Sequence, residues 1–437
     1  MKKLLRAARR KVGGFTLVEL MIALLGGLFV ALAVVALSKQ ATNTVFEESR
    51  TATAEMSGRV AIDRLRADLS RAAFMSTGNV RKDPRIMVPR GYTGAPVSWN
   101  GPPAGTGFVN LASLQVFASS SVSSNINTLS TPNGLGPDAI RVGGNLTTTD
   151  DYVVEDILPA GSGSCLGNRI ALATDTPSMY RIGGSLAALQ AAFLPVAGAN
   201  FMIRLLDLTT NKYSFHVVCA VGFGPPVDGG VNQPYVDITN TPPVLAATEG
   251  GPSGFGAGRV VINPVQLADW YIGDRSQDGD ASAAYAALTN DGGLDAKQYD
   301  LYRQWVDATG ARVGLPELVA EYAIDLQVAL TWDNTTGPPP ASGGASRLTS
   351  YGFGDANNRT VTTTVSAGAS SPQRVRSIRV RLATRAAQPD RTDPLPGPDA
   401  GGFMYRYCWD PPTCSMYARV RTFTTDVALP NQAQLYY

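Results

Sequence analysis

Four cysteines carry the clearest covalent chemistry in the sequence. Cys408 and Cys414 enclose the short segment WDPPT, a tight turn, so we expect a disulfide between them. By elimination, Cys165 would then pair with Cys219. An even cysteine count favours disulfides in an oxidising compartment, and no pair has the C-x-x-C spacing of zinc or thioredoxin-like sites. The cysteines therefore predict structural cross-links in an exported protein.

An acidic segment begins like a calcium-binding loop. Oxygen-bearing side chains alternate along it, with a glycine at the sixth position: Asp274, Ser276, Asp278 and Asp280. The twelfth position is Tyr285, where a calcium loop places a bidentate glutamate. Because the match is incomplete, a solvated Asp/Gly turn is the favoured interpretation, and we expect no metal there.

Catalytic chemistry is poorly represented. The only histidine, His216, lies in the apolar run YSFHVVCAV, which favours a hydrogen-bonded structural role. No segment assembles a nucleophile, a base and an oxyanion site, so we predict that the protein is not an enzyme and uses no cofactor. Aromatic and arginine side chains near the end of the chain could form a binding face or could pack around a disulfide loop: Tyr405, Arg406, Tyr407, Trp409 and Tyr417.

The charge is unevenly distributed along the 437 residues. Lys and Arg total 37 against 35 Asp and Glu, a formal net charge of +2, but residues 1–14 hold six of the basic residues and no acidic one. Without that segment, 31 basic residues stand against 35 acidic ones, a net charge of −4. A mildly acidic remainder argues against nucleic acid as a partner.

Residues 15–37 follow the basic segment as 23 residues with a single charge, Glu19. A run of about 20 apolar residues can cross a bilayer, and the preceding cations would keep the N-terminus in the cytoplasm. One interpretation is a secretory leader cleaved near Ala31-Leu32-Ala33, although the run is longer than the usual ~7–15 residues. A second is a plain signal anchor in which Glu19 is tolerated near the interface.

The third interpretation depends on the position of Glu19. Cleavage between Gly14 and Phe15 would make Glu19 the fifth residue of the mature chain. The new α-amine of Phe15, or that of a neighbouring copy, would then be a cation at a similar depth in the membrane. Pairing it with the carboxylate would reduce the cost of burying Glu19 and fix the register of packed helices.

Beyond the membrane segment, residues 38–74 contain no proline and carry an apolar stripe at helical spacing. Charged residues three or four apart are placed to pair with one another on the opposite face: Asp63–Arg66, Arg64–Asp68 and Asp68–Arg71.

Seven later segments are predicted to be strands: 138–142, 201–206, 213–221, 259–262, 324–332, 376–384 and 419–428. Residues 318–325 could instead form a short helix. Long Gly/Pro/Ser/Thr-rich stretches read as loops: 88–107, 119–137, 222–257, 335–374 and 386–402.

The string KVGGFTLVELMIAL resembles the leader of type IV prepilins, with Gly14, Phe15 and Glu19 at the family's three key positions. Three further segments resemble PilW-like minor pilins in the same order: 58–75, 318–333, and the pair 375–385 and 419–431. Together they cover about a quarter of the chain. This resemblance implies an α+β, type IV pilin-like fold: a leader (1–14), a membrane half-helix (15–37), an amphipathic half-helix (38–74) and an antiparallel β-rich head with large loop insertions (75–437), which could form one lobe or two.

The same resemblance implies what the protein would do. Prepilin peptidase would cut after Gly14 and methylate Phe15, and the subunit would help prime a type IV pilus at or near its tip, supporting adhesion and motility. Its partners would be other minor pilins, the major pilin and a PilY-like tip adhesin. It would reside in the inner membrane with its head in the periplasm, and then in the extracellular fibre. The alternatives are a GspJ-like minor pseudopilin of a type II secretion system and a membrane-anchored adhesin that does not polymerise.

Overall fold

The structure of the protein is a computed structural model of the chain. It describes residues 16–80, 82–83, 85–86, 111–118, 136–158, 165, 167–209, 211–224, 232–239, 260–275, 280, 284–285, 298–334, 348–362, 372–387, 389, 406–409 and 413–433. The chain divides into two units, Met1–Thr53 and Ala54–Tyr437.

Helix α1 runs from Leu17 to Ser70 and contributes to both units. Its sequence is rich in Ala and Leu, which favour helix, and proline is absent from it. The helix was expected to reach residue 74, but it ends at Ser70 and continues as turns. Ala73 and Met75 adopt left-handed backbone there, with φ of 61° and 50°, a conformation that cannot continue a right-handed helix.

Six strands in the middle of the chain close into a barrel. The strands β3, β4, β7, β6 and β5 pair in that order, and β8 pairs with both β3 and β5. Because every strand of this ring has a neighbour on both sides, the ring has no free edge. The bounds are β3 Tyr152–Leu158, β4 Arg169–Leu172, β5 Phe201–Asp207, β6 Lys212–Gly224, β7 Gln233–Ile238 and β8 Val260–Asp274.

Strand β8 belongs to two sheets. Its residues 260–265 pair with β5 in the barrel, whereas residues 266–274 pair with β2 and β9. The second half is the centre of an open antiparallel sheet in the order β1-β2-β8-β9-β10. Since β2 and β8 are neighbours in this sheet, the barrel is an insertion between two adjacent strands. The bounds are β1 Leu114–Ala118, β2 Asp138–Gly144, β9 Tyr299–Val306 and β10 Arg312–Ala320.

A third antiparallel sheet has the order β12-β11-β13-β15-β14. Its strands are β11 Ala323–Asp333, β12 Leu348–Ser350, β13 Val375–Arg385, β14 Arg406–Cys408 and β15 Tyr417–Ala428. The remaining helices are short: α2 Pro177–Ile182, α3 Leu186–Phe193, α5 Ala356–Thr362, the 3-10 helix η5 Pro372–Arg374 and α6 Pro430–Ala433.

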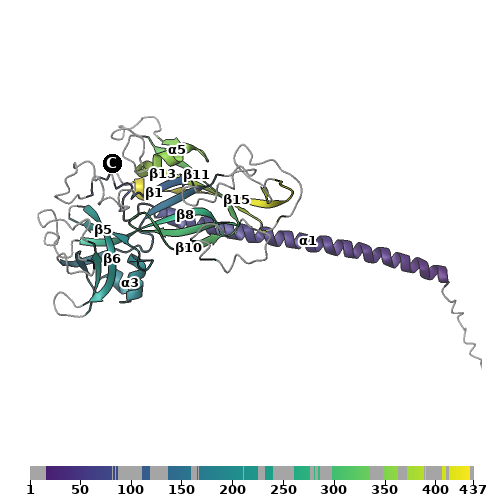
Figure 1. The fold of residues 1–437 in the computed structure, drawn as a ribbon, viewed down its shortest axis with the longest axis horizontal. Coiled ribbons are helices and arrows are strands. Elements are labelled where there is room, and N and C mark those ends of the chain that lie inside the picture. Colours follow the sequence, from purple (N-terminus) through teal and green to yellow (C-terminus); the bar gives the residue numbers. More distant parts are fainter. Residues whose placement is uncertain are drawn as a thin grey trace, which may run out of the picture. The chain divides into compact units, whose positions relative to one another are not determined.

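Separate hydrophobic cores hold these parts together. The largest combines Ala61, Leu65 and Leu69 of α1 with side chains of the open sheet and the third sheet. A second core fills the barrel and includes side chains of α2 and α3. A third packs the outer face of β5 and β6 against β8 and β9. Figure 1 shows β5, β6 and α3 grouped apart from β11, β13 and β15.

The head is therefore antiparallel and β-rich beside a long helix, which confirms the α+β class. All seven predicted strands are present, and most are longer than predicted. The alternation at residues 376–384 corresponds to β13, which is central in its sheet. β8 was predicted to be four residues long and has fifteen.

Several local predictions were wrong. Residues 318–325 are not a helix: β10 ends at Ala320 and β11 begins at Ala323, with a turn between them. Tyr322 makes this turn with a φ of 56°, and its amide donates to Asp300 at 2.8 Å. The stretch 222–257 contains β7, and the stretch 335–374 contains β12, α5 and η5. The predicted loop at 88–107 lies outside the described residues.

Candidate functional site on the N-terminal helix

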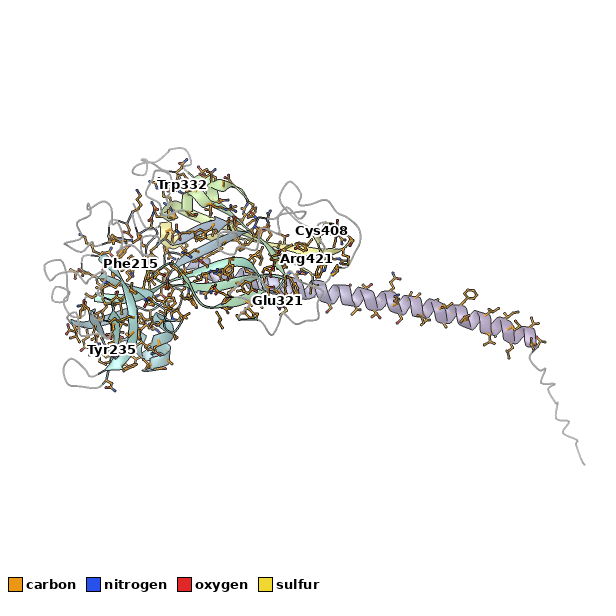
Figure 2. All side chains as sticks on the ribbon, in the orientation of Figure 1. Phe215, Tyr235, Glu321, Trp332, Cys408 and Arg421 are labelled. Atoms are coloured by element: carbon orange, nitrogen blue, oxygen red, sulfur yellow. A yellow bond between two sulfur atoms is a disulfide. The ribbon has the colours of Figure 1, made fainter. Side chains whose placement is uncertain are left out.

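The first part of α1 has the length and composition of a membrane span. The candidate span Leu17–Thr42 has 26 residues, its most apolar stretch has a mean hydropathy of 2.8, and none of that stretch is buried in this structure. At 1.5 Å per residue the segment is about 39 Å long, enough to cross a hydrocarbon core of about 30 Å. Figure 2 shows side chains projecting from this part of the helix along its whole length. An anchor or a signal sequence has this form.

Glu19 lies in the first turn of α1 and closes a reciprocal cap with Thr16. Its Oε2 accepts hydrogen bonds from the backbone N–H and the hydroxyl of Thr16, both at 3.0 Å. In return, the Glu19 N–H donates to Thr16 Oγ1 at 3.3 Å. This is a capping box, which satisfies two N–H groups that a helix N-terminus otherwise leaves unpaired.

The capping box assigns Glu19 a local role that the sequence analysis missed, although the T-x-x-E spacing was visible. It also places the carboxylate beside the backbone of Thr16, the residue directly after Phe15. Gly14 and Phe15, the predicted cleavage and methylation positions, lie outside the described residues. The predicted pairing of Glu19 with the amine of Phe15 therefore stays a prediction.

In the second unit, the last turns of α1 are fixed to the head by charged side chains. The Nε of Arg303 on β9 donates to Asp68 Oδ2 at 2.7 Å, and the indole N–H of Trp270 on β8 donates to the same oxygen at 3.1 Å. Both side chains of the ion pair are largely buried. Arg64 pairs with Glu317 on β10, and Arg71 donates to the Leu146 carbonyl at 2.8 Å.

These contacts overturn the predicted pairing within the helix. Asp63–Arg66, Arg64–Asp68 and Asp68–Arg71 are absent from the ion pairs of the described residues, and Arg64 and Asp68 instead reach strands more than 200 positions away. The one ion pair between described side chains of α1 is Glu55–Arg59, at 2.5 Å. Arg64, Asp68 and Arg71 therefore contact the head, whereas Asp63 and Arg66 are exposed.

One close contact fixes where α1 crosses the third sheet. Gly58 is buried against the ring of Phe423 on β15, and a Cβ at this position would lie 2.2 Å from Phe423 Cε2. Only glycine permits the two elements to approach this closely. The sequence around Gly58 gives no indication of this partner.

The structure contains the two disulfides that the spacing predicts. Cys408–Cys414 closes the turn between β14 and β15, with a Cα–Cα distance of 5.1 Å. Cys165–Cys219 joins the segment before β4 to β6 in the barrel, with a Cα–Cα distance of 6.4 Å. Each bridge links segments of one part of the head.

The aromatic residues beside the C-terminal disulfide mainly pack. Tyr407 and Tyr417 are buried, and Arg385 of β13 stacks on Tyr407 and Trp409, its guanidinium 5.4 Å and 4.3 Å from the ring centres. Tyr405 lies outside the described residues. Packing around the hairpin therefore accounts for most of the group that could have formed a binding face.

Only part of the calcium-loop candidate lies among the described residues. Asp274 is buried at the end of β8, and the Asp280 carboxylate accepts a hydrogen bond from Gln304 Nε2 at 3.0 Å. Ser276 and Asp278 lie outside the described residues. In the part of the chain that the structure describes, no three His, Cys, Asp or Glu side chains form a possible metal site.

His216 lies on β6 in register with Ile203, a residue of the barrel core. It is 1% exposed, and its Nε2 lies 2.7 Å from the Ser214 hydroxyl. This is the hydrogen-bonded environment expected of a structural histidine.

No protein-family model matches the sequence, and no curated protein or solved structure matches it. Functional inference therefore depends on the residues and contacts of this chain.

Proposed function

We propose that the protein is a minor pilin: a non-catalytic subunit of a type IV pilus that helps prime fibre assembly and sits at or near the tip. The observation that carries the proposal is the start of α1. A processing-type sequence, Gly14-Phe15, precedes an unburied apolar segment, Leu17–Thr42, whose single carboxylate, Glu19, lies in the first turn of α1. An apolar helix of this length needs lipid or other helices around it, because water cannot solvate its surface.

Cleavage after Gly14 would release an α-amine three bonds from the Thr16 N–H, which already donates to Glu19. That amine, or the amine of a neighbouring subunit, would be a suitable cation for the carboxylate in an apolar surrounding. Transfer of the helix from lipid into a helical bundle would keep its apolar surface covered throughout. The β-rich head would supply specific contacts to other minor pilins, the major pilin or a PilY-like adhesin.

Replacing Glu19 tests this function. Glu19→Ala should leave cleavage after Gly14 intact but reduce the amount of the subunit in sheared fibres at least tenfold, because the helix loses its register contact. Thr16→Ala is the matched control: it removes the hydroxyl contacts of the capping box and keeps the carboxylate, so incorporation should fall much less. Normal levels of Glu19→Ala in fibres would contradict the proposal.

A further inference from the structure

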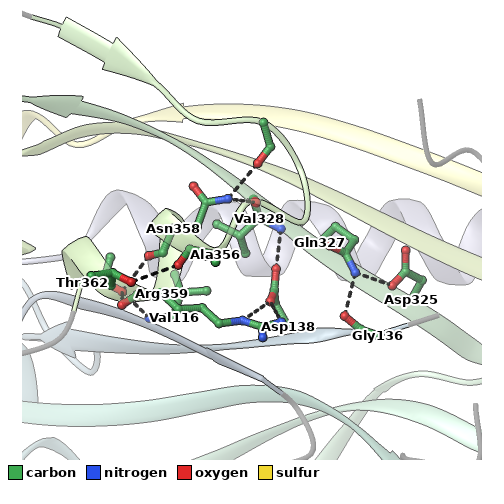
Figure 3. A network of polar contacts seen from close by, with 12 residues as sticks. Val116, Gly136, Asp138, Asp325, Gln327, Val328, Ala356, Asn358, Arg359 and Thr362 are labelled. Atoms are coloured by element: carbon green, nitrogen blue, oxygen red, sulfur yellow. Dashed lines mark hydrogen bonds and ion pairs between the residues drawn. The ribbon is translucent and has the colours of Figure 1, made fainter. Parts of the chain in front are cut away.

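An edge of the open sheet and an edge of the third sheet meet at a layer of polar side chains, which includes side chains of α5. We call this layer the seam. Strand β1 is the outer strand of the open sheet, and β11 is paired with β12 only through residues 331–333. Along both edges, side chains take the place of a neighbouring strand (Figure 3). Residues 348–362, comprising β12, a turn and α5, supply most of these side chains, and we call them the strap.

The strap bonds backbone groups that a strand would otherwise pair. Asn358 accepts from the Leu330 N–H at 3.1 Å and donates to the Val328 carbonyl at 2.7 Å. On the other edge, the Val116 N–H donates to the Thr362 hydroxyl at 3.0 Å. The α5 sequence, ANNRTVT, consists largely of weak helix formers, so these tertiary bonds rather than intrinsic helicity hold it in place.

Two buried carboxylates lie at the seam: Asp138 contacts the strap directly, and Asp325 is linked to it through Arg381. Asp138 accepts from the Val328 N–H at 3.0 Å and from Arg359 Nη2 of α5 at 2.6 Å. Asp325 accepts from Gln327 Nε2 at 3.0 Å and lies 3.6 Å from Arg381 of β13. The Gln327 amide also donates to the Gly136 carbonyl at 2.9 Å, which joins the two sheets.

The strap covers Asp138 and the partner of Asp325. The ring of Phe353 covers the Arg381 guanidinium at 4.7 Å, and Arg359 covers Asp138. Both carboxylates are no more than 3% exposed. The charged groups that face Asp325 are Arg381 from β13 and Asp138 from β2, with Arg359 of α5 behind Asp138.

Burial favours the protonated form of both acids. Desolvation raises the pKa of Asp138 in spite of its bonds to Arg359 and Val328. Desolvation also raises the pKa of Asp325 to about 6, a rise that Asp138 increases and that Gln327 and Arg381 oppose. A carboxylate exposed by lifting the strap would return to an ordinary pKa near 4, because water would solvate its charge.

We propose that the strap is a pH-responsive cover over the seam, held closed in mild acid and opening more often as the pH rises toward neutrality. The closed state binds a proton at Asp325 more tightly than the open state does, so protons favour closure by linkage. Opening releases Val116, Leu330 and Val328 from the strap while the β11–β13–β15 ladder remains paired.

Hydrogen-exchange mass spectrometry of the full chain in detergent micelles tests this directly. After correction for intrinsic exchange rates, peptides covering 114–118 and 326–332 should show about a tenfold larger opening constant at pH 7.5 than at pH 5, as proton linkage with these pKa values requires. The opening constant of peptides from β13 and β15 should be the same at both pH values. Equal protection at both pH values, or an equal change in β13–β15, would overturn the proposal.

Two variants isolate the responsible group. Asp325→Asn should lower the change in the opening constant of 326–332 between pH 5 and pH 7.5 well below tenfold, because only Asp138 still titrates under the strap. The control variant is Asp426→Asn, which alters an exposed carboxylate of β15 that pairs with Arg379 of β13. It should keep the wild-type pH dependence. A pH dependence as large in Asp325→Asn as in the wild type would contradict the assignment, and the wild-type comparison stands even where a variant folds poorly.

Discussion

Asp68 of α1 and Arg303 of β9 form an ion pair at 2.7 Å, and the Trp270 indole donates to the same carboxylate oxygen. The two charged residues are separated by 235 positions in the chain. Because both are largely buried, the pair joins the helix to the open sheet at a defined position. Removing one partner leaves the other charge without compensation, which costs more than losing an exposed pair.

Asp68→Ala should therefore lower the free energy of unfolding of the head by about 2–4 kcal/mol. Tryptophan fluorescence during urea unfolding of the full chain in micelles measures this, since Trp270 is part of the contact. Glu55→Ala, which removes the exposed pair with Arg59 on the same helix, should cost less than about 1 kcal/mol. Equal effects of the two variants would show that the Asp68 contact does not hold the helix.

Gly58→Ala should destabilise the head by about 1–3 kcal/mol, because the new methyl group meets the Phe423 ring. The smaller side chain of Phe423→Leu makes room, so the double variant should be more stable than the sum of the single effects by at least about 1 kcal/mol. Urea unfolding of the four proteins gives this coupling. Strict additivity would mean that the helix does not lie against β15 at this point.

The Asp325 carboxyl should make stability depend on pH. Its pKa of about 6 in the folded head lies above the ordinary value, so its contribution is fully present below about pH 4 and is lost as the pH rises through 6. The loss of stability caused by Asp325→Asn should therefore be smaller at pH 7.5 than at pH 4.5, by about 2 kcal/mol. Urea unfolding at both pH values measures the difference, and a constant difference would contradict the buried-acid account.

The two disulfides should contribute unequally. Cys165–Cys219 spans 54 positions and Cys408–Cys414 spans 6, and a longer loop loses more chain entropy when it is closed in the unfolded state. Replacing both cysteines of the longer bridge by serine should therefore cost about 2 kcal/mol more than the same change in the shorter one. Thermal unfolding of the two double variants tests this, and a larger loss from the short bridge would contradict it.

Features with local signatures were predicted from the sequence. The apolar and Ala-rich composition of α1 and the strict alternation of β13 each indicate one element without knowledge of the rest. The barrel was not predicted, because its closure depends on β8 pairing with β3 and β5, strands that are distant in sequence. The segment of α5 has no apolar period, since its Asn and Thr side chains serve strand edges rather than a helix face.

The candidate site was predictable in a similar way. Glu19 stands out as a lone carboxylate in an apolar run, which identifies it without a structure. Its cap partner Thr16 requires the knowledge that the helix begins at Leu17. Asp325 and Asp138 gave no signal, because their raised pKa values arise from burial between sheets that only the fold brings together.

The proposed function depends most on what happens at Gly14 and Phe15. Mass spectrometry of the mature N-terminus, on protein recovered both from membranes and from sheared surface fibres, tests it most directly. We expect a chain that begins at Phe15 with a methylated α-amine and is present in both fractions. A chain that retains Met1 and occurs only in membranes, or one that begins near Val34 and is soluble, would contradict the account.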